Sequence, residues 1–286
     1  MNNERKLKYR SRGVAALLSL IFIIGMMACT AVTASAGILD FWFPFTGSEE
    51  TSQGPVGSLS GSNPSYHSGY VVDISKHNGD IDFNQMKASG VDGCMMRAAY
   101  GMAEDIRFEE NSSKAEAAGV PYGVYHFVNW HYDSKTNGDF NTAVQKAQEQ
   151  ANFLISLLQG KRVRGYVACD LELEANCTTS LSKEQMTSIA NYYMDIIHSA
   201  GYKPMLYCSI SWLKNRMNSD DVKYPLWIAY YHDTGSFEFP DTNYGDSMRG
   251  MSDRIYLWQY SSGGYGPDYG AQAERIDMNR LYRSFT

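Results

Sequence analysis

The chain has 286 residues, of which 44% are apolar and 20% charged, so it can bury a large core without disulfides or metals, which excludes a disordered protein. Its 25 Lys and Arg residues against 31 Asp and Glu residues give a net charge of −6. That balance argues against a general nucleic-acid binder, whose affinity comes from neutralising phosphates, so we expect no nucleic acid among its partners.

Residues 1–36 have the anatomy of an export signal. Basic residues up to Arg12 precede an apolar stretch that begins at Val14, and a small-residue cleavage site ends at Ala36. The apolar stretch is long enough to cross a bilayer, so an uncleaved membrane anchor is the alternative, and lipid attachment at Cys29 is a weaker third. In each case we predict that the rest of the chain acts outside the cytoplasm, secreted or held at the cell surface.

Residues 37–69 are predicted to be a linker. Of the 23 residues from Gly47 to Gly69, twelve are Gly or Ser, and the apolar residues there show neither helical nor strand spacing. This composition is typical of a flexible tether. The folded domain is therefore expected over residues 70–286.

From residue 70 the pattern changes to short apolar runs that alternate with longer helical ones. The predicted strands are Tyr70–Ile74, Gly93–Ala98, Pro121–Phe127, Gly165–Leu173, Lys203–Ser209, Pro225–Tyr230, Arg254–Gln259 and Arg275–Asn279. The predicted helices are Phe108–Ala118, Asn141–Gln159 and Ser182–Ala200. This alternation indicates an α/β fold, and eight strands favour an irregular, TIM-barrel-like (β/α) barrel with a mostly parallel sheet in a single domain. Irregularity is expected at the last strands, where the connections lack clear helices.

Four cysteines lie in the predicted domain: Cys94, Cys169, Cys177 and Cys208. They allow three pairings, and the sequence leaves their disulfide state open, although apolar strand-like surroundings favour buried thiols at three of them. The sequence contains no CxxC pair, no HExxH and no Gly-rich phosphate-binding motif. We therefore expect no metal and no cofactor.

Acidic side chains gather at predicted strand ends. Asp73 closes the first strand, Asp170 and Glu172 close the fourth, and Asp277 lies in the eighth. Chemistry in a parallel barrel occurs at the C-terminal ends of strands, and alternation places Asp170 and Glu172 on one side. Two acids this close lose their protons at different pH values, because the charge on one raises the pKa of the other. Such a pair, with one acid protonated and the other ionised, suits general acid chemistry on an acetal. Ion pairing or loop capping is the alternative, purely structural role.

Aromatic side chains supply a second feature of the same strands. The candidates for contacts with a sugar are Tyr125, His126, Trp227 and Tyr230. Flat rings beside carboxylates suit stacking against pyranose faces, although strand aromatics also serve as core. For His126 the alternatives are a general base and a hydrogen-bonded core residue.

Short motifs across residues 70–286 are specific as an ordered set. They include Asp73-Ile74-Ser75-Lys76-His77-Asn78-Gly79, Arg97-Ala98, Gly123-Val124-Tyr125-His126-Phe127, Asp170-Leu171-Glu172, Trp227-Ile228-Ala229 with Tyr230, Trp258-Gln259-Tyr260 and Ile276-Asp277-Met278-Asn279. This set resembles the family 25 glycoside hydrolases, the Chalaropsis-type lysozymes, which are N-acetylmuramidases. The resemblance implies an irregular β/α barrel that needs no metal. It departs at Asn78-Gly79, where many members have Gln-Gly.

The resemblance also implies residue roles at the matching positions. Glu172 is the expected proton donor, with Asp73, Asp170 and Asp277 as the other active-site acids. Arg97 and Gln259 join the expected substrate contacts.

The function predicted from all of this is an exported, monomeric muramidase that acts on peptidoglycan glycan strands. A chitinase-like glycosidase is one alternative, because Asp-x-Glu strand ends also serve cleavage of N-acetylglucosamine polymers. A non-catalytic glycan-binding module is another, although binding alone has no need of clustered acids. The sequence leaves open the biological role of wall cleavage and whether a carboxylate or the substrate's 2-acetamido group attacks the anomeric carbon. The Asp170-x-Glu172 spacing favours the acetamido group.

Overall fold

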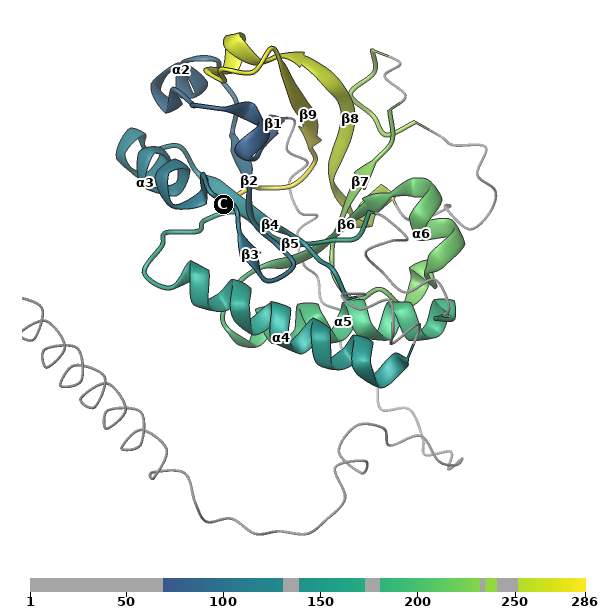
Figure 1. The fold of residues 1–286 in the computed structure, drawn as a ribbon. Helices are drawn as coiled ribbons and strands as arrows, with labels where there is room; N and C mark the ends of the chain where they lie inside the picture. Colours follow the sequence, from purple (N-terminus) through teal and green to yellow (C-terminus); the bar gives the residue numbers. More distant parts are fainter. Residues whose placement is uncertain (1–68, 131–138, 173–180, 232–234, 241–251) are drawn as a thin grey trace, which may run out of the picture. The chain divides into compact units, whose positions relative to one another are not determined.

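Eight strands close into a barrel in the computed structural model, which describes residues 69–130, 139–172, 181–231, 235–240 and 252–286 (Figure 1). They are β1 (Gly69–Ile74), β2 (Gly93–Tyr100), β4 (Tyr122–Phe127), β5 (Val167–Asp170), β6 (Pro204–Ser209), β7 (Leu226–Ala229), β8 (Ile255–Tyr265) and β9 (Arg275–Leu281). A short strand, β3 (Ala103–Glu104), pairs with the end of β2. All eight predicted strands are therefore present, and the barrel prediction is confirmed.

The irregularity expected at the last strands is a reversal of direction in β9. Neighbouring strands run parallel from β1 through β2, β4, β5, β6 and β7 to β8. In contrast, β9 is antiparallel to both β8 and β1. The connection from β8 to β9 holds a 3-10 helix, Gly266–Tyr269, and is shorter than the crossover of about a dozen residues that parallel strands require. As a result, the beginning of β9 lies where the parallel strands end.

Helices cover the outside of the barrel. They are α2 (Phe83–Ala88), α3 (Phe108–Ala118), α4 (Phe140–Leu158), α5 (Lys183–Ser199) and α6 (Ile210–Arg216), with further 3-10 turns at Lys76–Asn78, Ser219–Asp221 and Ser252–Arg254. The three long helices match the predicted ones, and α4 and α5 lie side by side (Figure 1). The short helices α2 and α6 were not predicted, because six or seven residues do not repeat an amphipathic period. No helix among the described residues is long and apolar enough to span a membrane.

Capping side chains fix where the long helices begin. The Asp139 carboxylate accepts a hydrogen bond from the Thr142 amide at the start of α4. At α5, Ser182 and Gln185 form the predicted capping box, in which each side chain bonds the other residue's backbone amide. These caps set the helix register that turns the apolar faces of α4 and α5 toward the barrel.

Two apolar layers hold the fold together. The outer layer lies between strands and helices and contains the buried residues Cys94, Cys169 and Cys208, whereas Cys177 falls outside the described residues. The inner layer fills the barrel with side chains from alternate strand positions: Val71, Met95, Ala168, Met205, Tyr207, Trp227, Leu257 and Leu281. The side chain of Phe285 joins this inner layer from the end of the chain.

Two glycines make room for Phe285. A Cβ atom added at Gly93 or at Gly165 would lie 2.6 Å from the Phe285 ring, which is closer than real contacts allow. The Tyr166 hydroxyl also donates to the Ser284 carbonyl at 3.0 Å and fastens the same segment. The filled interior leaves the opposite end of the barrel, where β1, β2, β4 and β5 finish, for the functional side chains.

Candidate active site

The structure brings the four predicted acids together at one end of the barrel. Asp73 on β1 lies directly opposite Asp277 on β9, and Asp170 ends β5 two residues before Glu172. The charges of these groups act on one another across the barrel: those of Glu172 and Asp73 on Asp170, and that of Asp277 on Glu172. The reversed direction of β9 is what brings Asp277 to this end.

Asp73 and Asp277 affect each other's titration. Their side chains lie close together where β1 pairs with β9. Burial and the charge of Asp277 hold the pKa of Asp73 well above its usual range, and burial also raises the pKa of Asp277. The raised pKa values of both residues favour a protonated carboxyl group at this pair.

Gln259 holds one side of Asp73. Its amide nitrogen donates to Asp73 Oδ2 at 3.0 Å, and its oxygen accepts from the hydroxyls of Tyr207 at 2.8 Å and Tyr231 at 2.9 Å. Gln259 is buried and its oxygen is fully used. Gln259 thus orients Asp73, and its predicted contact with substrate stays a prediction.

Asn279 holds the same oxygen from β9. Its amide nitrogen donates to Asp73 Oδ2 at 2.9 Å and to the Val71 carbonyl at 3.0 Å, and its oxygen accepts from the Trp227 indole at 2.7 Å. Trp227 is only 1% exposed and its ring packs against Tyr207, with centroids 4.4 Å apart. The prediction that Trp227 stacks on a sugar is therefore wrong, because the ring lies beneath the acids, inside the barrel.

Asp170 is a deeply buried acid. Its side chain is 1% exposed, and neither carboxylate oxygen has a hydrogen-bond donor among the described residues. Burial raises the pKa of Asp170 well above its usual range, the charges of Glu172 and Asp73 raise it further, and the Arg97 guanidinium lowers it. Buried polar groups in proteins are nearly always hydrogen-bonded. Asp170 is therefore prepared to accept a hydrogen bond from a ligand.

Glu172 is the most open of the four acids. The residue as a whole is exposed, whereas its carboxyl group faces the other acids. Burial of that group and the charge of Asp277 raise the pKa of Glu172, while its contact with the Tyr207 hydroxyl and the charge of Arg97 lower it. A carboxyl group with a raised pKa, on an exposed residue at the barrel mouth, can hold a proton and deliver it to a ligand.

Arg97 and Tyr125 also face this end of the barrel. Arg97 forms an ion pair with Asp105, with Nε 2.7 Å from Oδ2, and its charge still reaches the carboxyl groups of Asp170 and Glu172. Tyr125 is half-buried and meets the Trp227 ring edge-on. Both predicted residues therefore lie beside the acids.

Two tyrosines of the site were missed from the sequence. Tyr207 and Tyr231 reach Gln259, whereas the predicted Tyr230 packs against the outer apolar layer next to Phe239. Burial and the charges of Asp277, Asp73 and Glu172 raise the pKa of Tyr231 to about 12. Alternation along β6 and β7 was the available signal, since it places Tyr207 on the inner side with Met205 and separates Tyr230 from Tyr231.

His126 does not reach the acids. Its side chain is fully buried on the outer side of β4, where Nδ1 lies 2.9 Å from the Tyr193 hydroxyl of α5 and Nε2 lies 2.7 Å from the Gly101 carbonyl. Burial lowers the pKa of His126 to about 4. This position corrects the prediction of a substrate contact, because Tyr125 takes the inner side of β4 and its neighbour must point outward.

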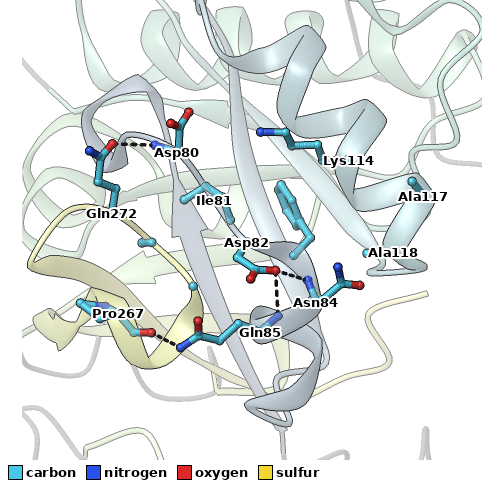
Figure 2. Close-up of a pocket in the computed structure, with 13 residues that line it drawn as sticks. Asp80, Ile81, Asp82, Asn84, Gln85, Lys114, Ala117, Ala118, Pro267 and Gln272 are labelled. Atoms are coloured by element: carbon cyan, nitrogen blue, oxygen red, sulfur yellow. Dashed lines mark hydrogen bonds between the residues drawn. The ribbon is translucent and has the colours of Figure 1, made fainter.

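One pocket of the described residues lies away from this site. Figure 2 shows the segment from Asp80 to Gln85 between Lys114 of α3 on one side and Pro267 and Gln272 on the other. Its volume is about 720 Å³, and none of the four acids lines it. Among the described residues, no group of three or more His, Cys, Asp or Glu side chains is arranged to hold a metal ion.

Comparison with known proteins gives a family and a set of relatives. Residues 72–269 match the family described as Glycosyl hydrolases family 25. An autolytic lysozyme of Clostridium acetobutylicum is 24% identical over 232 residues, which cover 74% of this chain and 65% of that protein. A D-alanyl-L-alanine endopeptidase of Streptococcus phage B30 is 32% identical over 148 residues, which cover 50% of this chain and 29% of that protein. The chain thus matches less than two thirds of the length of each.

Solved structures share the barrel. The CTP1L endolysin aligns with a TM-score of 0.58 and 25% identity over 76% of this chain and 67% of that chain. A bacterial lysozyme from Streptomyces coelicolor aligns with a TM-score of 0.57 and 21% identity over 75% of this chain and 92% of that chain. The second match, at this identity, concerns the fold alone.

Proposed function

Because the chain belongs to glycosyl hydrolase family 25, we propose that it is a muramidase, which hydrolyses the β-1,4 bond between N-acetylmuramic acid and N-acetylglucosamine in peptidoglycan. The name of the clostridial relative, an autolytic lysozyme, supports this substrate. The single observation that carries the proposal is the pair of Asp170, which is buried with no hydrogen-bond partner among the described residues, and Glu172, an exposed residue whose carboxyl group has a raised pKa. Two carboxyl groups in such different surroundings suit the two roles that acetal hydrolysis needs.

In the proposed mechanism Glu172 is the general acid. It gives its proton to the glycosidic oxygen as the bond to the anomeric carbon breaks. Asp170 accepts a hydrogen bond from the N–H of the 2-acetamido group, so that the acetamido oxygen attacks the anomeric carbon and forms a positively charged oxazolinium ring. Water then opens the ring at the anomeric carbon and gives its proton to the Glu172 carboxylate, which restores the starting state.

Ligand binding would determine which of the two carboxyl groups, Asp170 or Glu172, carries the proton. In the ligand-free protein burial favours a proton on Asp170, and the pKa of Glu172 is raised as well. An N–H donor lowers the pKa of the carboxyl group that accepts it, whereas a sugar covering Glu172 removes water from it and raises its pKa. Substrate thereby favours the ionised form of Asp170 and the protonated form of Glu172.

The test is a parallel digestion of purified peptidoglycan and of chitin oligomers, with mass analysis of the new reducing ends. New N-acetylmuramic acid ends are expected from peptidoglycan, with no release from chitin. Chitin cleavage would indicate the chitinase alternative, and binding without any product would indicate a glycan-binding module. Glu172→Gln is expected to lose about 10²-fold in turnover, the scale for a positioned proton donor. Glu149→Gln, on the exposed side of α4, is the matched control and should keep wild-type turnover.

We also propose the arrangement of the chain around this domain: an export signal or anchor over residues 1–36, a tether over 37–69 and the enzyme over 70–286. The first 68 residues lie outside those that the structure describes. One chain supplies all four acids, which supports a monomer. Export from a bacterium followed by N-terminal sequencing should give a first residue near Gly37. Full-length chain in the membrane pellet would establish the anchor instead, and full-length chain in the cytoplasm would contradict export.

A further inference from the structure

A second hollow lies where β2 turns into β3, and one of its lining residues, Phe127, is the direct neighbour of Asp170 across the β4–β5 pair. Its volume is about 330 Å³, within the range of ligand pockets. Arg97 lines it from one side, and the same guanidinium acts on the carboxyl groups of Asp170 and Glu172. A ligand bound at those acids could therefore extend into this pocket without crossing the barrel.

The pocket and its rim expose an unusual amount of apolar surface. Tyr100, Met102 and Ile106 are 45%, 51% and 80% exposed, and they are three of the six large apolar side chains that the described residues expose. Tyr100 rests on Phe127, with ring centroids 5.0 Å apart, and both rings line the pocket together with Ile106. Contiguous exposed apolar side chains beside a reactive site indicate contact with a ligand.

The charges in the pocket have both signs. Arg97 and Asp105 neutralise each other in their ion pair. The Lys76 ammonium and the Glu104 carboxylate also line the pocket, and within the described ranges neither is in an ion pair; the His77 imidazole lines it as well. The pocket thus offers one cation, one anion and an apolar wall.

This part of the chain is held in place before any ligand binds. The Gly101 carbonyl accepts a hydrogen bond from the His126 ring, and the Gly101 amide donates to the Phe127 carbonyl at 2.9 Å. The Asp105 amide donates to the Ala98 carbonyl, also at 2.9 Å. These bonds fix both arms of the turn between β2 and β3, so the pocket is preformed.

We propose that this pocket binds the peptide stem that a muramoyl residue carries on its lactyl group, so that the enzyme prefers peptide-bearing glycan to bare glycan. The inference rests on the proposed muramidase function. The stem combines small apolar residues, free carboxylates and a diamino acid, which match the apolar wall, Lys76 and Glu104 respectively. A bare sugar offers neither the cation nor the anion for these two side chains.

The experiment compares two soluble substrates of equal glycan length, one with intact peptide stems and one from which an amidase has removed them. The measured quantity is the ratio of kcat/KM for the two. The wild-type ratio is expected to favour intact stems about tenfold, the scale of one charge-assisted contact. Lys76→Gln and Ile106→Ser should each lower that ratio severalfold. Lys114→Gln and Tyr265→Ser change an exposed lysine and an exposed large apolar side chain elsewhere on the surface and should leave the ratio at the wild-type value.

Each other outcome overturns the inference. A wild-type ratio near one, or pocket variants with the wild-type ratio, would remove the peptide stem as the ligand while leaving the muramidase proposal intact. Equal losses on both substrates in Lys76→Gln would mean that the pocket binds the glycan itself. Failure of the wild type to hydrolyse either substrate would overturn the muramidase proposal and this inference with it.

Discussion

Acidification is expected to destabilise this fold through His126. Nε2 donates to the Gly101 carbonyl at 2.7 Å, which leaves Nδ1 to accept from the Tyr193 hydroxyl at 2.9 Å. A second ring proton would break that accepted bond in a fully buried place, and burial lowers the pKa from 6.5 to about 4. One pKa unit corresponds to about 1.4 kcal/mol, so the lowered pKa of this imidazole reduces the free energy of unfolding by about 3 kcal/mol at low pH.

The sign follows from proton binding in the two states. Between pH 6.5 and about 4 the unfolded chain binds a proton at this imidazole and the folded chain does not, so the free energy of unfolding falls as the pH decreases. Below about pH 4 both states bind the proton and this loss stops growing. Asp73 and Asp170 act in the opposite direction, because their raised pKa values let the folded state bind protons first.

A comparison of two proteins isolates the histidine from those acids. Urea unfolding at pH 7 and pH 4 gives the free energy of unfolding for the wild type and for His126→Gln, whose side chain does not titrate. The wild type should lose about 3 kcal/mol more than the variant between the two values. His198→Gln, at the exposed end of α5, should follow the wild type. Identical losses in wild type and His126→Gln would refute this account of the buried imidazole.

Two further predictions concern the barrel interior and the site charge. Phe285→Ala empties the space beside Gly93 and Gly165, so it should lower the free energy of unfolding, measured in urea, by about 3–5 kcal/mol. A loss below about 1 kcal/mol would show that the Phe285 ring contributes little to stability. Arg97→Gln removes a cation that lowers the pKa of both Asp170 and Glu172, so both limbs of the pH profile of kcat/KM should move to higher pH, and unmoved limbs would contradict this role.

The sequence predicted the strands well because each is a short apolar run between turn residues. It did not predict the reversal of β9, since direction depends on the length of a connection and both directions bury the same residues. It also missed α2 and α6, which tertiary contacts hold in place without a repeated amphipathic pattern. Local patterns thus located the elements, and the topology at the closing strand depended on contacts between distant segments.

The sequence located the acids at the strand ends, but it did not show how deep in the barrel an inward side chain lies. Asp73 and Asp170 mark the inward-facing positions of their strands, and the same alternation of side chains separates Tyr125 from His126. Alternation does not distinguish an inward residue at the barrel mouth from one beneath it. The sequence therefore predicted that Trp227 stacks against a sugar, although its ring lies in the barrel interior and its indole donates a hydrogen bond to Asn279.

The separate roles of Asp170 and Glu172 give a prediction about pH. The productive state of the pair has an ionised Asp170 and a protonated Glu172, so activity should follow a bell whose two limbs belong to the coupled pair. Asp170→Asn leaves one titrating carboxyl group, and the acidic limb should vanish from the residual activity. The basic limb should move to lower pH, because the wild-type pair releases its last proton against a negative charge that the variant lacks.

The measurement is kcat/KM against pH on peptide-bearing glycan, for wild type and Asp170→Asn, with Asp195→Asn on the outer side of α5 as the control. The control should keep both limbs, because its carboxylate pairs with Lys223 away from the barrel mouth. Loss of the acidic limb without movement of the basic one would mean that the two carboxyl groups do not interact. An Asp170→Asn enzyme with full activity and an unchanged bell would mean that Asp170 neither orients the acetamido group nor needs to be ionised, and the direct attack of a carboxylate on the anomeric carbon would then be the better mechanism.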